Sequence, residues 1–223
     1  ELLRASVASA GNDHRLGANE APPAIVSVFL GDELQSIVDD IIAGTHTAGA
    51  GAAKIQLGVT TLPVFSKDNT DRNRTSPFAF TGNRFEFRMP GSSQNIACVN
   101  MMLNTAVADV FKNYADELEG AEDFDAALNA LVKRELTAHQ RVIFNGNGYD
   151  DSWVEEAEKR GLPNLKSTPE ALACYDEFVD VFEATGVLSE TELLSRKEIL
   201  LEEYAKLIKI ESRTMVDMAK KDI

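Results

Sequence analysis

The stretch NRTSPFAFTGNRFEFRMPGSSQ, residues 73–94, decides how this chain folds. At its centre, residues 84–88 read RFEFR and alternate strictly between charged and aromatic side chains. Successive side chains of a β-strand point to opposite faces of the sheet. The pattern therefore predicts a strand that carries Arg84, Glu86 and Arg88 on one face and buries the two intervening phenylalanines behind the other.

Arginine is concentrated around this strand. Residues 71–88 hold four arginines and two acids, a local charge of +2 (four minus two) in a chain whose net charge is −14. A guanidinium group is a planar fork that suits phosphate or carboxylate groups. A carboxylate kept ionised between two guanidinium groups is a good ligand for a hard cation. The charged face is therefore either a solvated surface whose charges neutralise one another, or a site for phosphate groups and Mg²⁺.

A second unusual stretch lies near the start of the chain. Residues 11–23 read GNDHRLGANEAPP, a polar and glycine-rich run that turns abruptly into apolar sequence. Such a run is either a plain surface loop before a helix that begins with proline, or a mobile segment that covers a site.

Both stretches resemble parts of glutamine synthetases. In that family an Asn-Arg pair is followed by a hairpin, a strand reading Arg-x-Glu-x-Arg and a turn into a helix, and residues 73–94 are similar to this signature. Residues 11–23 resemble the family's flap, where an arginine precedes a loop that ends in Glu-Ala-Pro. Type I enzymes carry a further arginine where this chain has Ala79, and this difference, with FAFTGN at residues 78–83, points to the type III branch.

The resemblance implies an ATP-dependent ligase that joins glutamate and ammonium through γ-glutamyl phosphate. It implies that Arg74 and Arg88 contact the transferring phosphoryl group and the side-chain carboxylate of the substrate. Arg74 and Arg84 are the implied nucleotide contacts, and Glu86 is the implied ligand of Mg²⁺ or Mn²⁺.

The flap resemblance adds two residues to the implied site. Arg15 binds the α-carboxylate of glutamate, and Glu20 closes over the site, holds ammonium and takes its proton. The family also implies self-association into a ring-shaped homo-oligomer, a dodecamer.

The predicted fold class is α+β. We expect a partial antiparallel catalytic sheet of the glutamine synthetase/guanidino kinase type, backed by a large helical region. Residues 1–94 form the C-terminal portion of the catalytic domain, and residues 95–223 form the helical region, which continues from it and makes subunit contacts. Apolar spacing and capping signals predict helices over Ala24–Ala43, Asn95–Glu119, Asp123–Gln140, Asp150–Arg160, Ser167 to about Gly186, and Ser189 to about Lys220.

Composition narrows the functional classes. An apolar fraction of 44% is that of a globular protein, and a net charge of −14 argues against nucleic acid or a membrane as partner. Two cysteines and three histidines give neither a disulfide framework nor zinc-ligand spacing. The chain shows no signal peptide and no initiator methionine, so we expect either a processed product or a fragment of something longer, located in the cytoplasm.

We expect this fragment to be inactive alone, because the family's other acidic metal ligands have no counterpart in it. Two alternatives remain open. One is another ligase or kinase of the same superfamily, such as a γ-glutamyl–amine ligase. The other is a non-catalytic helical interaction module, although the intact Arg-Glu-Arg face argues against decay of the site.

Overall fold

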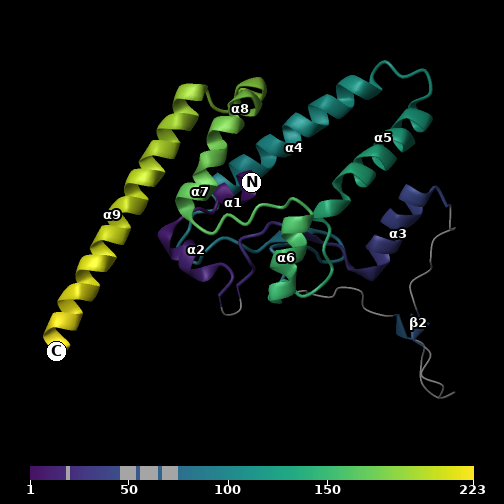
Figure 1. Ribbon diagram of the computed structural model, residues 1–223. Coiled ribbons are helices and arrows are strands. Elements are labelled where there is room, and N and C mark those ends of the chain that lie inside the picture. The colour runs from purple at the N-terminus through teal and green to yellow at the C-terminus, as the bar shows by residue number, and fades with distance from the viewer. Residues whose placement is uncertain (19–20, 46–53, 56–64, 67–74) are drawn as a thin grey trace.

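The computed structural model describes residues 1–18, 21–45, 54–55, 65–66 and 75–223 (Figure 1). The fold is α+β, and most of the described residues are helical. The α-helices are α1 (Leu2–Ala5), α2 (Ala10–Arg15), α3 (Gly31–Ala43), α4 (Ala97–Leu118), α5 (Phe124–His139), α6 (Asp151–Lys159), α7 (Thr168–Leu172), α8 (Val179–Thr185) and α9 (Glu190–Asp222). Two 3₁₀ helices are η1 (Gln140–Val142) and η2 (Ala173–Glu177), and the strands are β1 (Val28–Phe29), β2 (Lys54–Ile55), β3 (Phe65–Ser66), β4 (Phe78–Phe80) and β5 (Phe85–Phe87).

The three-stranded sheet is mixed, in the order β1-β4-β5. Strands β4 and β5 form an antiparallel hairpin, as the family resemblance implies, and Ala79 lies opposite Glu86 in it. Strand β1 pairs in parallel with β4, so the prediction of an antiparallel sheet is wrong for this pair. Strands β2 and β3 form a separate antiparallel pair.

The aromatic face of the hairpin is only partly covered. Phe87 is half-buried and packs against the cluster of Val7, Met89 and Val99. Phe85 is 47% exposed, so its predicted burial is wrong. Its ring instead stacks on the ring of Phe78, with the two ring centroids 5.4 Å apart. This contact covers one face of the Phe85 ring.

The predicted helix over Ala24–Ala43 begins only at Gly31. The β-branched residues before it take extended backbone, because Val28–Phe29 pairs with β4 and Ile25 forms a bridge with Asn164. The Oδ1 atom of Asn145 then accepts hydrogen bonds from the N–H groups of Leu30 and Gly31, at 2.9 and 3.1 Å, and so caps the start of the helix.

The helical region surrounds the largest core cluster. Helices α4 and α5 form an antiparallel hairpin, α3 packs on α5, and α9 runs past α7 and α8 before its carboxyl end stands away from the rest (Figure 1). The single helix predicted from Ser167 to Gly186 is broken into α7, η2 and α8. The predicted start of the last helix at Ser189 is confirmed, and Ser189 forms a capping box with Glu192 there. The cluster joins α1, α4, η2, α8 and α9 through buried side chains that include Met102, Tyr175, Phe182 and Leu193.

Within the described ranges, no helix combines the length and the apolar composition that crossing a bilayer requires.

A glycine holds the loop after η1 against the start of the hairpin. The N–H group of Gly148 donates to Oγ1 of Thr75 at 2.7 Å, and a Cβ atom at Gly148 would lie 2.7 Å from the carbonyl oxygen of Thr75. We expect Gly148→Ala to lower the free energy of unfolding by about 1–3 kcal/mol, because backbone has to move. Gly120→Ala is the control, since a Cβ atom there has no neighbour within 4 Å. Equal unfolding midpoints of the two variants in urea would contradict the prediction.

Candidate active site

The charged face of β5 is assembled around Glu86. Its Oε1 atom lies 3.3 Å from Nη2 of Arg84, and its Oε2 atom lies 3.1 Å from Nη2 of Arg88. All three side chains therefore share one face, as the alternation predicts. Arg88 is 19% exposed and Arg84 is 68% exposed, so the pair combines one fixed and one solvent-facing guanidinium group.

These contacts keep the Glu86 carboxylate ionised. The hydrogen bond from Arg88, joined by that from Arg84, holds the pKa of Glu86 below its ordinary value against a weaker opposing effect of burial. An ionised carboxylate group thus lies between two guanidinium cations on the surface of the sheet.

Arg15 is the last residue of helix α2, and its side chain contacts the backbone just after β5. Its Nη1 atom donates to the carbonyl oxygen of Met89 at 2.8 Å, and Nη2 reaches the carbonyl oxygen of Arg88 at 3.4 Å. Two predicted site residues that are 73 positions apart in sequence, Arg15 and Arg88, are therefore neighbours in space.

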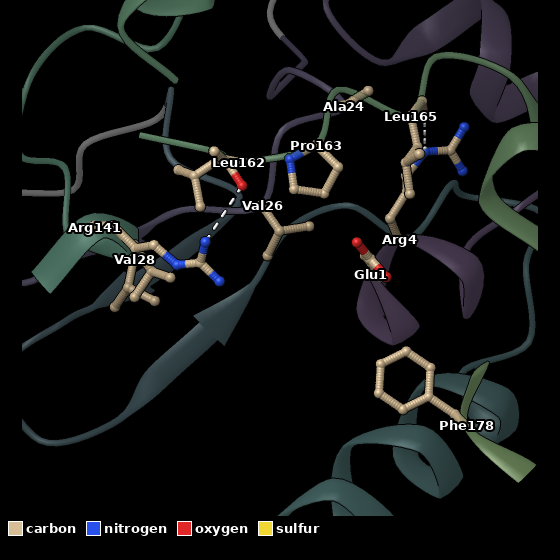
Figure 2. A pocket seen from close by; sticks show the side chains of 12 residues that line it. Glu1, Arg4, Ala24, Val26, Val28, Arg141, Leu162, Pro163, Leu165 and Phe178 are labelled. Carbon is tan, nitrogen blue, oxygen red and sulfur yellow. Dashed lines mark hydrogen bonds between the residues drawn. The ribbon is translucent and has the colours of Figure 1, made fainter. Parts of the chain in front are cut away.

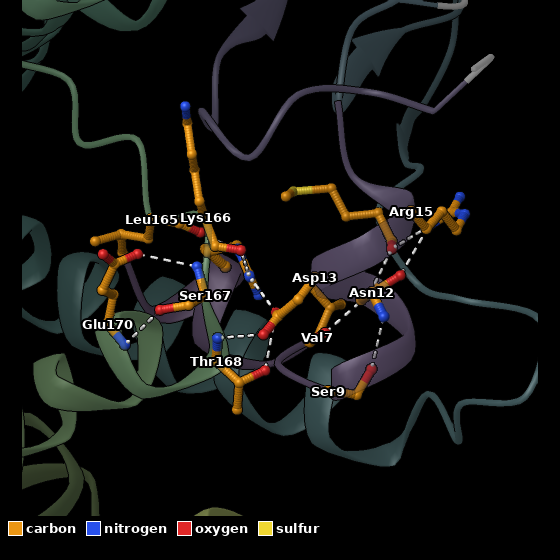
Figure 3. Close-up of polar contacts among 12 residues, drawn as sticks. Val7, Ser9, Asn12, Asp13, Arg15, Leu165, Lys166, Ser167, Thr168 and Glu170 are labelled. Atoms are coloured by element: carbon orange, nitrogen blue, oxygen red, sulfur yellow. Dashed lines mark hydrogen bonds and ion pairs between the residues drawn. The ribbon is translucent and has the colours of Figure 1, made fainter. Parts of the chain in front are cut away.

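Helix α2 is anchored on its other side by a buried ion pair (Figure 3). Arg4, which is 1% exposed, donates from Nη2 to Oδ1 of Asp13 at 2.9 Å. The same carboxylate accepts from the backbone N–H and the hydroxyl of Thr168, at 2.7 and 2.9 Å. The first N–H groups of a helix have no partner within it, so Asp13 caps α7 from a distant part of the chain.

Serine caps give the two helices of this contact their starting points. Ser9 accepts from the N–H of Asn12 at the start of α2, and Ser167 forms a capping box with Glu170 at the start of α7. Only the start at Ser167 is predicted from the sequence, because residues 11–23 are interpreted there as a loop or flap. The partnership of Asp13 with Arg4 and Thr168, and that of Asn12 with Arg15, cannot be predicted, because no local pattern says which distant group each will meet.

Four of the six predicted site residues lie in the described part of the chain: Arg15, Arg84, Glu86 and Arg88. Glu20 and Arg74 lie outside the described residues. The carboxylate of Glu86 is the type of ligand that a divalent cation prefers. It is one group, however, whereas Mg²⁺ takes about six oxygen ligands. No cluster of three or more histidine, cysteine, aspartate or glutamate residues suited to a metal occurs in the part of the chain that the structure describes.

A cavity of about 440 Å³ lies elsewhere, beside α1 (Figure 2). Its wall includes Arg4, Val26 and Arg141, and none of the four described site residues lines it. Figure 2 shows the guanidinium group of Arg4 turned to the carbonyl oxygen of Leu165, which it reaches from Nε at 2.7 Å. The cavity is therefore not the predicted site.

Comparison with known proteins points to one family. Residues 127–223 match the family model of the glutamine synthetase C-terminal domain. The chain is 48% identical over 98% of its length to a type-3 glutamine synthetase of Dictyostelium discoideum, and 48% identical over 100% of its length to a glutamine synthetase of Butyrivibrio fibrisolvens. A glutamine synthetase of Bacteroides fragilis is 44% identical over 98% of the chain. The chain spans only 30–32% of the length of these relatives.

The lowered pKa of Glu86 predicts a pH dependence of stability. A carboxyl group whose pKa falls on folding contributes stability above the unfolded-state pKa, about 4.3 for glutamate, and loses that contribution as the pH falls through the folded-state value. The difference in unfolding free energy between the wild type and Glu86→Gln should therefore be largest near neutral pH and shrink in acid. Urea unfolding across this pH range measures the difference, and a constant value would contradict the ion-pair assignment.

Proposed function

This chain belongs to the glutamine synthetase family, and from that premise we propose that it is the C-terminal part of an ATP-dependent glutamate–ammonia ligase. The observation that carries the proposal is the contact of Arg15 with the backbone of Arg88 and Met89, at the end of the strand that carries the Arg84-Glu86-Arg88 face. A carboxylate-binding group and a phosphate-binding face then adjoin, as a substrate that is both amino acid and phosphoryl acceptor requires. The fragment alone is proposed to be inactive, because Glu86 is the one metal ligand that we propose among the described residues.

The proposed reaction has two steps, and both gather negative charge at the arginines. ATP first phosphorylates the γ-carboxylate of glutamate to give γ-glutamyl phosphate, and ammonia then displaces the phosphate to give glutamine. Arg88 and Arg74 stabilise the charge on the transferring phosphoryl group, and Arg84 together with Arg74 binds the nucleotide phosphates. The 68% exposure of the Arg84 side chain supports a role toward a ligand that arrives from solvent.

Arg15 is proposed to bind the α-carboxylate of glutamate. Its Nε atom has no hydrogen-bond partner within the described residues, while Nη1 is fixed by the protein. The Nε side of the guanidinium group therefore remains for a carboxylate. Glu20 is proposed to cover the site, hold ammonium and accept its proton.

The proposed cofactors are ATP and Mg²⁺ or Mn²⁺. Glu86 would supply one anionic oxygen to the metal, and the other ligands would come from the rest of the whole protein. The bound cation would neutralise charge on the nucleotide phosphates. The short mixed sheet is proposed to be part of a larger catalytic sheet of the glutamine synthetase/guanidino kinase type, with residues 1–94 as catalytic portion and residues 95–223 as its helical continuation.

The helical region is proposed to mediate self-association into a ring-shaped homo-oligomer, a dodecamer by family resemblance. Large apolar side chains on α4, α5 and α9 are exposed, including Phe111 at 66% and Met215 at 66%. Exposed apolar patches of this kind are typical of protein interfaces. The proposed compartment is the cytoplasm, which the two free cysteines, Cys98 and Cys174, support.

Two variants of the full-length protein separate the proposed roles. Glu20→Ala should spare ATP binding and acyl-phosphate formation but lower glutamine formation about 10²–10⁴-fold, the effect of losing a general base. Arg88→Ala should lower acyl-phosphate formation itself by about 10²–10³-fold, because it removes charge stabilisation at the phosphoryl group.

The measurements are nucleotide affinity, trapped acyl phosphate and glutamine, with Lys206→Ala as an exposed control and larger amines as rival acceptors. Near-normal glutamine synthesis at low ammonium in Glu20→Ala would reject the flap assignment. Faster reaction with a larger amine than with ammonium would favour a γ-glutamyl–amine ligase.

The last half of α9 offers a test of assembly. Met215 and Met218 are 66% and 59% exposed, so glutamates at both positions should leave the fold intact. We expect this double variant to dissociate the oligomer in sedimentation experiments, because burying the new charges at an interface is costly. Arg213→Glu is the control, since helix spacing puts Arg213 on the opposite side of α9. An assembled double variant that lost only catalytic rate would contradict the interface assignment.

A further inference from the structure

We propose that Asn12 is a positioning residue for Arg15, and that it presents the Nε side of the Arg15 guanidinium group to the α-carboxylate of the amino-acid substrate. The substrate clause rests on the proposed function. The positioning itself rests on four polar contacts of one buried amide, which is 2% exposed.

The orientation of the Asn12 amide is fixed by its surroundings. Its Nδ2 atom lies 2.9 and 3.0 Å from the carbonyl oxygens of Val7 and Met89 and 2.9 Å from Oε1 of Gln94, so its two N–H groups are shared among three acceptors. Carbonyl oxygens only accept hydrogen bonds, so the amide nitrogen must face them. The oxygen is thereby turned to Arg15, and a flipped amide would place oxygen against oxygen and nitrogen against a cation.

The Asn12 oxygen is one of two acceptors that hold the Nη1 atom of Arg15. Nη1 of Arg15 donates to Oδ1 of Asn12 at 3.1 Å and to the carbonyl oxygen of Met89 at 2.8 Å. Met89 accepts from both side chains, so the two groups are held by a common oxygen. Both donors of Nη1 are used in this way.

Gln94 holds the amide group of Asn12 in place. It accepts from the N–H of Gly91 at 2.8 Å and from Asn12, and it donates to the carbonyl oxygen of Val7 at 3.1 Å and to Ser9 at 3.2 Å. Asn12 therefore cannot rotate without breaking contacts to the turn after β5 and to the start of α2. A long arginine side chain that is fixed before the ligand arrives loses less freedom on binding it.

The test is a double-mutant cycle on the full-length enzyme with Asn12→Ala and Arg15→Ala, measured as kcat/KM for glutamate. We expect Asn12→Ala to lower this value about tenfold through KM, with the KM for ATP unchanged, and to have no further effect when Arg15 is already alanine. Thr168→Val is the structural control, because it removes a hydrogen bond to the adjacent Asp13 and leaves the Asn12–Arg15 contact in place. At equal loss of thermal stability, this control should keep the KM for glutamate.

The outcomes distinguish a failure of the positioning role of Asn12 from a failure of the proposed function. Additive effects of the two alanines, or an equal rise of KM in Thr168→Val, would overturn the positioning role and leave the ligase intact. An unchanged kcat/KM in Arg15→Ala would instead reject Arg15 as the carboxylate ligand. Where Asn12→Ala does not fold, Gln94→Leu takes its place, with a smaller fall in kcat/KM expected that disappears in the Arg15→Ala background; an unchanged value would overturn the proposal.

Discussion

The buried ion pair of Arg4 and Asp13 is the contact on which the geometry of the site depends. Asp13 also accepts two hydrogen bonds from Thr168, so one carboxylate joins α1, α2 and α7. Removing one partner of such a pair typically costs about 3–5 kcal/mol, because a charge is left buried without compensation. Arg15, two residues after Asp13 in the same helix, reaches the backbone at the end of β5.

The helical region consequently does more than cover the sheet. Thr168 belongs to the part of the chain that sequence analysis treats as structural, and its contact with Asp13 spans 155 positions. Through this contact, a helix without predicted site residues of its own holds one side of α2. The structure thus couples the helical region to the substrate side of the proposed site through a short path of hydrogen bonds.

The sequence predicts the charged face of β5 better than it predicts the contacts that hold the neighbouring helix α2. The RFEFR alternation is sufficient for the strand and for the shared face of Arg84, Glu86 and Arg88, because a period of two has one structural meaning. It is insufficient for the burial of Phe85, which depends on what lies over the sheet. The helix expected from Ala24 begins at Gly31, because pairing with β4 outweighs apolar spacing. The polar partners of α2 could not be predicted, because they lie far away in sequence and meet the helix only once the chain has folded.

The short helix α2 also limits how related sequences can vary. Each residue turns an α-helix by about 100°, so Asn12, Asp13 and Arg15 address three different neighbours from fixed angles. One insertion or deletion among them would rotate every later side chain away from its partner at once. Differences in length between related chains are therefore expected outside the stretch from Ser9 to Arg15. Alignments should show a block without gaps from Ser9 to Arg15, followed by a segment whose length is free to drift.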